Sequence, residues 1–399
     1  MVEKYLKSNL CHLPWTSIET RPDGKYTPCC LYKEHIEDGQ KKYNTVDHTV
    51  SDVQNSEYMN RLRKSFIAGE KPKGCEACWK EEQSGKTSKR QNAWIKMPII
   101  GEGAIKKNAV APHFIDMKLG NICNLKCRIC SPYASSQITP EFMKMDPHNK
   151  EHWRKQNKLG MWPRTKNSFL DGAEEWLQHV RYFEITGGEP LMIKKQFDVL
   201  KKCIDIGVAH KIDLHYNTNG TQYPEEAVTE IWPKFKRVEL AFSIDDIERR
   251  FEYQRKNAKW DTVNDNIIKY KNSGMKNLQT QICTTINLFN IMHLDELAVH
   301  VDRWSPDYWH INVLHWPVEF DVQRLGNDIK QIITKKLSGC KLYKDEIASA
   351  INYLNQESQD SIIDFEEMRN SKIKLFDKFR HENFKDVFPE LNELLRVYE

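Results

Sequence analysis

Long apolar runs and an excess of charge are both missing from this 399-residue sequence. No window is apolar over the roughly 20 residues that a membrane-spanning helix requires. The first ten residues, MVEKYLKSNL, lack the continuous apolar core of a signal peptide. The 60 basic residues are nearly balanced by 56 acidic ones, and no block is strongly basic, so nucleic-acid binding is not indicated. We therefore expect a cytoplasmic protein without a membrane partner.

Eleven cysteines are the most informative residues that are present. In a reducing compartment, clustered cysteines serve metal binding or catalysis more often than disulfide bonding. Cys203, Cys283 and Cys340 stand alone in apolar or amphipathic segments, and we interpret them as small buried or half-buried hydrophobic side chains. The other eight form two groups, one at residues 123–130 and one in the N-terminal region.

The first group has the spacing Cys-x3-Cys-x2-Cys in GNICNLKCRIC, with Cys123, Cys127 and Cys130. Three thiolates cannot complete a tetrahedral zinc site, nor can they coordinate all four irons of a cubane cluster. The site therefore requires a further ligand from elsewhere.

The second group combines Cys11, the adjacent Cys29 and Cys30, and the pair Cys75 and Cys78. Cys-x2-Cys is a metal-binding knuckle, and two thiolate pairs form a closed four-ligand site for either zinc or an iron–sulfur cluster. The segment WTSIETRPDGKYTPCC predicts a hairpin with Pro-Asp-Gly at its turn. Such a hairpin brings the cysteines at its two ends together.

Six β-rich runs alternate with amphipathic helical stretches from residue 113 onward. They are HFIDMKL, RYFEIT, KIDLHYN, RVELAFSI, LQTQICTTI and YWHINVL. Repeated βα units predict an α/β fold with parallel strands inside helices, as in a partial (β/α)6 TIM-like barrel. Ligands of such sheets bind at the C-terminal ends of the strands, where the cysteine triplet, TGGEP and NTNG are expected to form one site.

Taken together, these motifs resemble the radical S-adenosylmethionine (SAM) superfamily. Cys123, Cys127 and Cys130 match its cluster signature, and residues 187–190 match its GGEP motif. The resemblance implies that the three cysteines hold three irons of a [4Fe–4S] cluster. It also implies that SAM binds the fourth iron through its amino and carboxylate groups, which supplies the missing ligand.

The resemblance further implies a set of SAM-binding residues. These are Gly187, Gly188, Glu189, Asn217, Asn219, Ser243 and Arg255. The two glycines have no Cβ and so permit close approach of the backbone to a ligand. Arg255 would pair with the SAM carboxylate, with a solvated helical charge as the alternative. For the two asparagines, the alternative is turn formation by NTNG.

The N-terminal cysteines resemble the auxiliary-cluster regions called SPASM and twitch domains. The matching elements are Cys11, Gly24-x4-Cys29 and Cys75-x2-Cys78. The resemblance implies a second [4Fe–4S] cluster held by these four cysteines, with zinc as the alternative. The spacing from Gly24 favours Cys29 over Cys30 as the ligand. Such modules usually follow the barrel, whereas this one precedes it.

The family's chemistry implies reductive cleavage of SAM to a 5′-deoxyadenosyl radical, which abstracts hydrogen from a substrate C–H bond. We expect the substrate to be a peptide or protein and the electron donor to be a reductant such as flavodoxin or ferredoxin. The alternatives are a dehydrogenase of a small alcohol or sugar and a non-catalytic metal-binding scaffold. The expected organisation is an auxiliary region at 1–111, a barrel at 112–317 and helices packing on the barrel at 318–399.

Overall fold

The computed structural model describes residues 2–83, 87–314, 316–356 and 365–398. The chain divides into two compact units. The first unit comprises residues 1–122, 155–216 and 225–238, and the second comprises residues 123–154, 217–224 and 239–399. Within the described residues, no helix combines the length and apolar character needed to cross a membrane.

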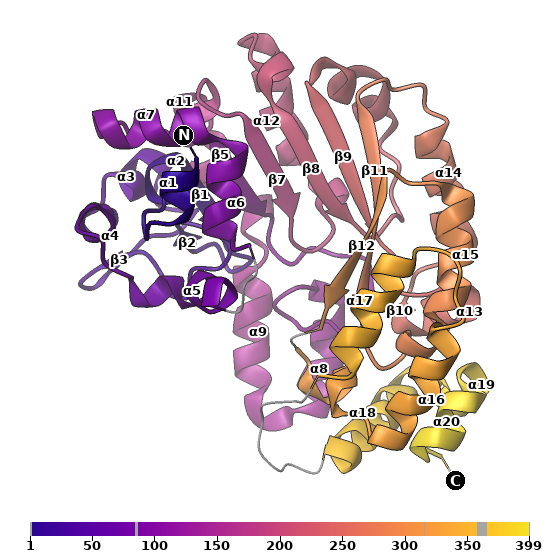
Figure 1. The fold of residues 1–399 in the computed structure, drawn as a ribbon. Helices are drawn as coiled ribbons and strands as arrows, with labels where there is room; N and C mark the ends of the chain where they lie inside the picture. The colour runs from indigo at the N-terminus through magenta and orange to yellow at the C-terminus, as the bar shows by residue number, and fades with distance from the viewer. Residues whose placement is uncertain (1, 84–86, 315, 357–364, 399) are drawn as a thin grey trace. The chain divides into compact units, whose positions relative to one another are not determined.

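The strands of the first unit are arranged in the order β8–β7–β5–β1–β2, and β5, β7 and β8 lie side by side (Figure 1). Their bounds are β1 Ser17–Thr20, β2 Tyr26–Thr27, β5 Phe114–Lys118, β7 Tyr182–Thr186 and β8 Asp213–Thr218. The pairs β1–β5, β5–β7 and β7–β8 are parallel, while β1 and β2 form an antiparallel hairpin. The predicted N-terminal hairpin is therefore confirmed, and its turn places Gly24 at a φ of 81°, which favours glycine. A short separate hairpin pairs β3 (Glu37–Asp38) with β4 (Lys41–Lys42).

Helices of the first unit form where apolar residues recur at helical spacing. In α12 (Lys194–Asp205), the buried residues Val199, Leu200 and Cys203 lie at intervals of one and three and so share one face. A capping box between Ser88 and Gln91 begins α6. The other helices are α1 Glu3–Leu6, α2 Leu13–Thr16, α3 Val50–Gln54, α4 Glu57–Ile67, α5 Glu76–Gln83, α6 Lys89–Lys96, α7 Pro98–Lys107, α10 Ser168–Asp171 and α11 Glu174–Leu177.

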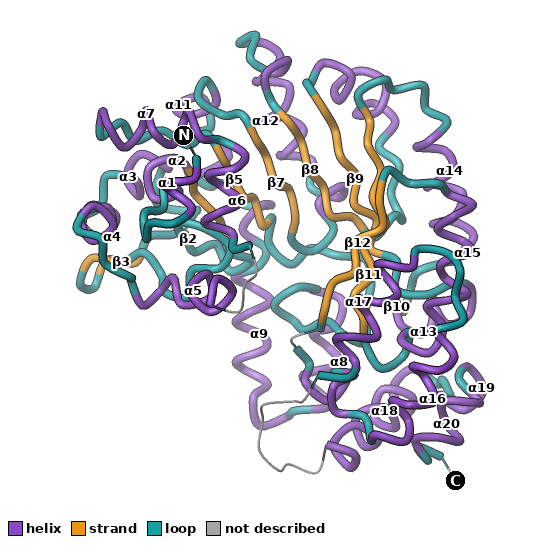
Figure 2. The backbone as a smooth tube through the Cα atoms, in the orientation of Figure 1, coloured by secondary structure: helices purple, strands orange, loops and turns teal. Residues whose placement is uncertain are grey.

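The second unit contains the remaining three predicted barrel strands, in the order β12–β11–β9. They are β9 Arg237–Ser243, β11 Leu278–Ile286 and β12 Tyr308–Val313. The pair β11–β12 is parallel, and Figure 2 shows its two strands side by side. A two-residue antiparallel pair joins β6 (Lys126–Cys127) to β10 (Arg255–Lys256). All six predicted strands are present, and the predicted α/β class with mainly parallel strands is confirmed.

Helices make up the rest of the second unit. The strand-linking helices are α8 Thr139–Met145, α13 Glu248–Gln254, α14 Trp260–Lys271 and α15 Leu294–Trp304, and α9 (Lys150–Leu159) runs from this unit into the first. The C-terminal helices are α16 Asn327–Leu337, α17 Lys344–Leu354, α18 Phe365–Arg380, α19 Phe384–Val387 and α20 Pro389–Leu395. The predicted helical C-terminal region is confirmed, and α17 packs against β12.

Candidate functional site

The loop that follows β5 carries the cysteine triplet of the second unit. Cys123 and Cys127 are buried and Cys130 is half-buried. A hydrogen bond between Cys130 and Cys127 lowers the pKa of the Cys127 thiol and raises the pKa of Cys130. The nearby Arg255 guanidinium also favours the Cys127 thiolate, which is the form that binds metal.

Arg255 faces this loop because β10 pairs with β6, which places Arg255 opposite Cys127. Its Nε and Nη2 atoms donate to one oxygen of Asp245 at 3.0 and 2.6 Å, and its Nη1 atom donates to Cys127 Sγ at 3.9 Å. Arg255 is 8% exposed, so it does not have the environment of a solvated helical charge. Its pairing with the SAM carboxylate remains a prediction.

Asn219 lies beside the first cysteine of the triplet. Its Nδ2 atom donates to Cys123 Sγ at 3.8 Å and to Asn124 Oδ1 at 2.9 Å. Its Oδ1 atom accepts hydrogen bonds from the backbone and hydroxyl of Thr221, which fixes the turn. Turn formation and contact with the triplet therefore coexist at Asn219. Asn217 and Ser243 are half-buried, one in β8 and the other at the end of β9.

The GGEP loop belongs to the first unit, where it packs on the segment that leads into the triplet. A Cβ at Gly187 would lie 2.7 Å from the Leu119 backbone nitrogen, and one at Gly188 would lie 2.3 Å from the Ile122 carbonyl oxygen. Both glycines have positive φ angles, of 84° and 51°. The backbone of Glu189 donates to the Ile122 oxygen at 2.8 Å. The glycines thus permit close packing of two backbones, a reason that the motif alone did not reveal.

Arg128, inside the triplet, was missed by the sequence reasoning. It is fully buried, and its Nη2 atom donates to Asp377 and Glu382, both at 2.7 Å. Its guanidinium carbon lies 3.5 Å from the centre of the Tyr253 ring. No spacing rule signals this contact, because its partners lie about 250 residues away in the chain.

The four predicted N-terminal ligands meet at one pocket in the first unit. Cys11, Cys29, Cys75 and Cys78 line it together with Leu13, Leu31, Tyr32, Phe66, Trp79 and Arg90. Burial raises the pKa of each of the four thiols above its ordinary value. Because metals bind the thiolate, occupation of this pocket would release protons. Among the described residues, no three His, Cys, Asp or Glu side chains are close enough to hold a single metal ion.

Cys30 lies outside that pocket and has different neighbours. Burial raises the pKa of its thiol to about 11, and the charges around it belong to Lys89, Asp116, Glu184 and Glu19. The isolated cysteines are also accounted for: Cys203 is buried and Cys283 and Cys340 are half-buried.

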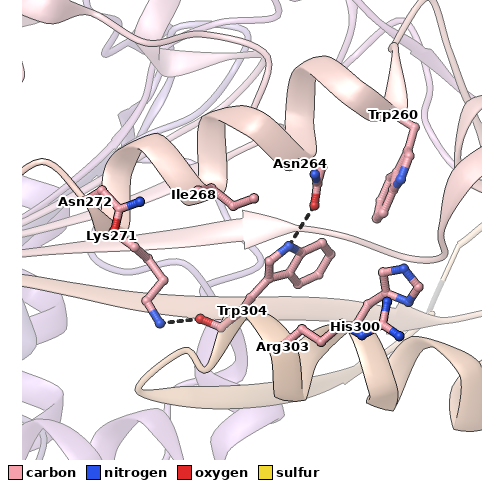
Figure 3. Close-up of a pocket in the computed structure, with 8 residues that line it drawn as sticks. All are labelled: Trp260, Asn264, Ile268, Lys271, Asn272, His300, Arg303 and Trp304. Carbon is pink, nitrogen blue, oxygen red and sulfur yellow. Dashed lines mark hydrogen bonds between the residues drawn. The ribbon is translucent and has the colours of Figure 1, made fainter.

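A separate groove between α14 and α15 contains none of the predicted site residues (Figure 3). Trp260 and Trp304 form its aromatic wall, with ring centres 5.7 Å apart. Trp304 Nε1 donates to Asn264 Oδ1 at 2.9 Å, and Lys271 donates to the Trp304 carbonyl oxygen. These bonds hold the two helices together, so packing accounts for the polar groups in this groove.

Two family models match the chain. The model of the radical SAM superfamily covers residues 117–303, and that of the SPASM iron–sulfur cluster-binding domain covers residues 11–79. Both predicted resemblances are therefore confirmed. No curated protein matches the chain.

Solved structures that match the chain include native anSMEcpe with bound AdoMet and Streptococcus suis SuiB bound to S-adenosylmethionine. The first is 15% identical, with a TM-score of 0.36, and the match covers 57% of this chain and 58% of that one. The second is 14% identical, with a TM-score of 0.37 and coverage of 73% and 63%. The chain thus spans less than two thirds of either structure's length.

Proposed function

We propose that this chain is a radical SAM protein with a SPASM-type N-terminal region, and that it modifies a peptide or protein by radical chemistry. The observation that best supports this proposal is the buried triplet loop of the second unit. It presents three thiols, with Asn219 against Cys123 and Arg255 against Cys127. Soft thiolate donors suit iron–sulfur binding, so this donor set fits the cluster that the family uses.

When bound, a [4Fe–4S] cluster would supply the electron for reductive cleavage of SAM and so the radical chemistry that removes hydrogen from a substrate. Cys123, Cys127 and Cys130 would hold this cluster. Arg255 favours the thiolate at Cys127 by its charge, and Asp245 fixes the orientation of the guanidinium. Glu189 anchors the GGEP loop to the residue before Cys123, through its backbone bond to Ile122.

For the N-terminal pocket we propose a second [4Fe–4S] cluster on Cys11, Cys29, Cys75 and Cys78. Four thiolates close the coordination shell, so this cluster would not bind SAM and would serve electron transfer or substrate placement. Zinc, which is also bound by four thiolates in structural sites, is the alternative. The proposed electron donor for the enzyme is a flavodoxin or ferredoxin. Dehydrogenation of a small alcohol or sugar is the alternative reaction.

The test is SAM cleavage by the anaerobically reconstituted protein with dithionite as reductant. The wild-type protein should produce 5′-deoxyadenosine. The variant with Cys123, Cys127 and Cys130 all changed to Ala should produce none, because SAM cannot bind an iron that is not held. Cys203→Ala, outside both cysteine groups, is the matched control and should retain cleavage. Equal 5′-deoxyadenosine production by the triple variant and the wild type would refute the proposed function.

A further inference from the structure

One face of the first unit's sheet carries charged side chains where a parallel sheet normally carries apolar ones. Glu19 on β1 is the register partner of Asp116 on β5, which in turn is the partner of Glu184 on β7. Register partners on neighbouring strands point to the same side, so the three carboxylates form a row. The alternating residues, such as Ile115 and Phe183, are fully buried and apolar. Packing therefore explains one face of this sheet but not the other.

Two lysines neutralise two of these carboxylates. Lys118 forms an ion pair with Glu19, and Lys89 from α6 lies 3.5 Å from a carboxylate oxygen of Glu184. The third carboxylate, Asp116, is 1% exposed, and neither of its oxygens has a hydrogen-bond partner. Burial, and then the charges of Glu184 and Glu19, raise the pKa of Asp116 well above its usual range. An isolated buried acceptor of this kind is costly to the fold.

A second unpartnered group lies on the same face. Thr186 is two residues beyond Glu184 on β7, directly before Gly187, and its hydroxyl is buried without a hydrogen-bond partner. Its register partner is Lys118. We define the polar face as Glu19, Lys89, Asp116, Lys118, Glu184 and Thr186. The Arg21 guanidinium lies 3.8 Å from Glu19 as well, so Glu19 and Glu184 both have cationic partners and Asp116 has no ion pair.

We propose that the polar face binds the substrate and that Asp116 accepts a positively charged nitrogen group, the ammonium or guanidinium of a basic peptide side chain. This inference rests on the proposed function. A cation supplies the donors that both Asp116 oxygens lack and gives this carboxylate the ion pair that Glu19 and Glu184 already have. A hydroxyl supplies a donor but no charge, and an anion is opposed by three carboxylates. The side chains of Lys89, Lys118 and Glu184 are about one-quarter exposed, which leaves an approach for a slender side chain.

The test compares ligands that differ in charge but not in shape. Nα-acetyl-argininamide and its neutral isostere Nα-acetyl-citrullinamide are titrated by calorimetry into the anaerobically reconstituted full-length protein with SAM. The wild type should bind the cationic probe at least about tenfold more tightly, as expected for one charge-assisted hydrogen bond. Asp116→Asn keeps the shape of the side chain and should remove this preference. Equal affinities in the wild type, or an unchanged preference in Asp116→Asn, overturn the proposal.

Two further variants control for folding and for general charge effects. Asp198→Asn changes an exposed residue of α12 and should leave the preference intact. If Asp116→Asn does not fold, Glu184→Gln decides, since Glu184 is half-buried and next to Asp116 in the row. An unchanged preference in Glu184→Gln then overturns the proposal. SAM cleavage is scored separately: cleavage without charge preference refutes the cation site alone, and charge preference without cleavage refutes the proposed function.

Discussion

Beside the cysteine triplet, the loss of unfolding free energy on substitution depends on which buried ion pair the substitution breaks. Asp245 is 1% exposed and accepts two hydrogen bonds from Arg255 and one from the Thr285 backbone. Because the pair is buried, each partner stabilises the fold mainly by compensating the charge of the other. Removal of one partner should therefore cost more than neutralisation of both.

We predict that Arg255→Ala lowers the free energy of unfolding by about 3–5 kcal/mol, because it leaves the Asp245 carboxylate buried and unpaired. The double variant Arg255→Ala/Asp245→Asn should lose less, since the amide still accepts from Thr285 and carries no charge. Urea denaturation of both variants and the wild type measures the difference. A double variant less stable than Arg255→Ala would show that charge compensation is not what Arg255 provides.

Titration of one buried histidine should make the stability of the fold depend on pH. Burial lowers the pKa of His293 to about 4, with Arg250 and Lys336 nearby. An unfolded histidine titrates near 6.5, so between pH 6.5 and pH 4 the unfolded state binds the extra proton and stability falls as pH falls. Up to about 3 kcal/mol should be lost over this range. In His293→Gln this part of the loss should disappear, as measured by unfolding at pH 7 and pH 4.5, and an identical pH dependence in the variant would contradict the assignment.

The sequence predicted where a residue lies only when that residue belongs to a recognisable motif. The triplet spacing predicted three cysteines on one loop, and Cys29 rather than Cys30 lines the N-terminal pocket. Arg128 and Asp116 were not predicted. Their environments depend on partners that tertiary structure brings together: Asp377 for Arg128, and Glu19 and Glu184 for Asp116.

At the scale of elements, α18 contacts the triplet loop through the side chain of Arg128. Asp377, on this helix, accepts from Arg128 and from the Tyr253 hydroxyl, both at 2.7 Å, and also from the Phe384 backbone at 2.7 Å. Arg380, also on α18, donates to Glu141 at 2.8 Å. Helix α18 thus holds the side chain of Arg128, which lies between Cys127 and Cys130 in the sequence.

We predict that Asp377→Ala lowers the iron held by the triplet and costs about 1–3 kcal/mol of unfolding free energy, because the Tyr253 hydroxyl and the Phe384 backbone lose their acceptor and Arg128 keeps only Glu382. Asp386→Ala, on the exposed side of α19, is the matched control and should behave as the wild type. Iron analysis and urea denaturation of the reconstituted proteins measure both effects. Full iron retention in Asp377→Ala would show that α18 does not support the cluster loop.

Local sequence patterns predicted the strands and the turn, but they did not predict which strands pair with one another. Alternation in HFIDMKL and RYFEIT predicted β5 and β7, and Pro-Asp-Gly predicted the turn between β1 and β2. The parallel pairing of β1 with β5 had no local signal, since those strands are about 95 residues apart and no turn sets their register.

At the scale of the whole molecule, the two cysteine groups belong to different compact units, with the N-terminal four in the first and the triplet in the second. Each proposed cluster has its own four or three cysteines, and no cysteine is shared. Metal loss at one group should therefore leave the other loaded. The sequence predicted both groups from spacing, but thiolates alone do not distinguish iron from zinc.

We predict about eight irons per chain after anaerobic reconstitution, four at each group, as expected for two cubane clusters. The Cys75→Ala/Cys78→Ala variant should keep about four irons and its SAM cleavage site, because the triplet ligands are intact. Metal analysis with Mössbauer spectroscopy measures this, and Cys30→Ala is the matched control that should keep all eight. About four irons with one zinc in the wild type would replace the second cluster by a zinc site and spare the radical SAM proposal. Loss of metal in Cys30→Ala but not in Cys29→Ala would instead assign the ligand to the neighbouring residue.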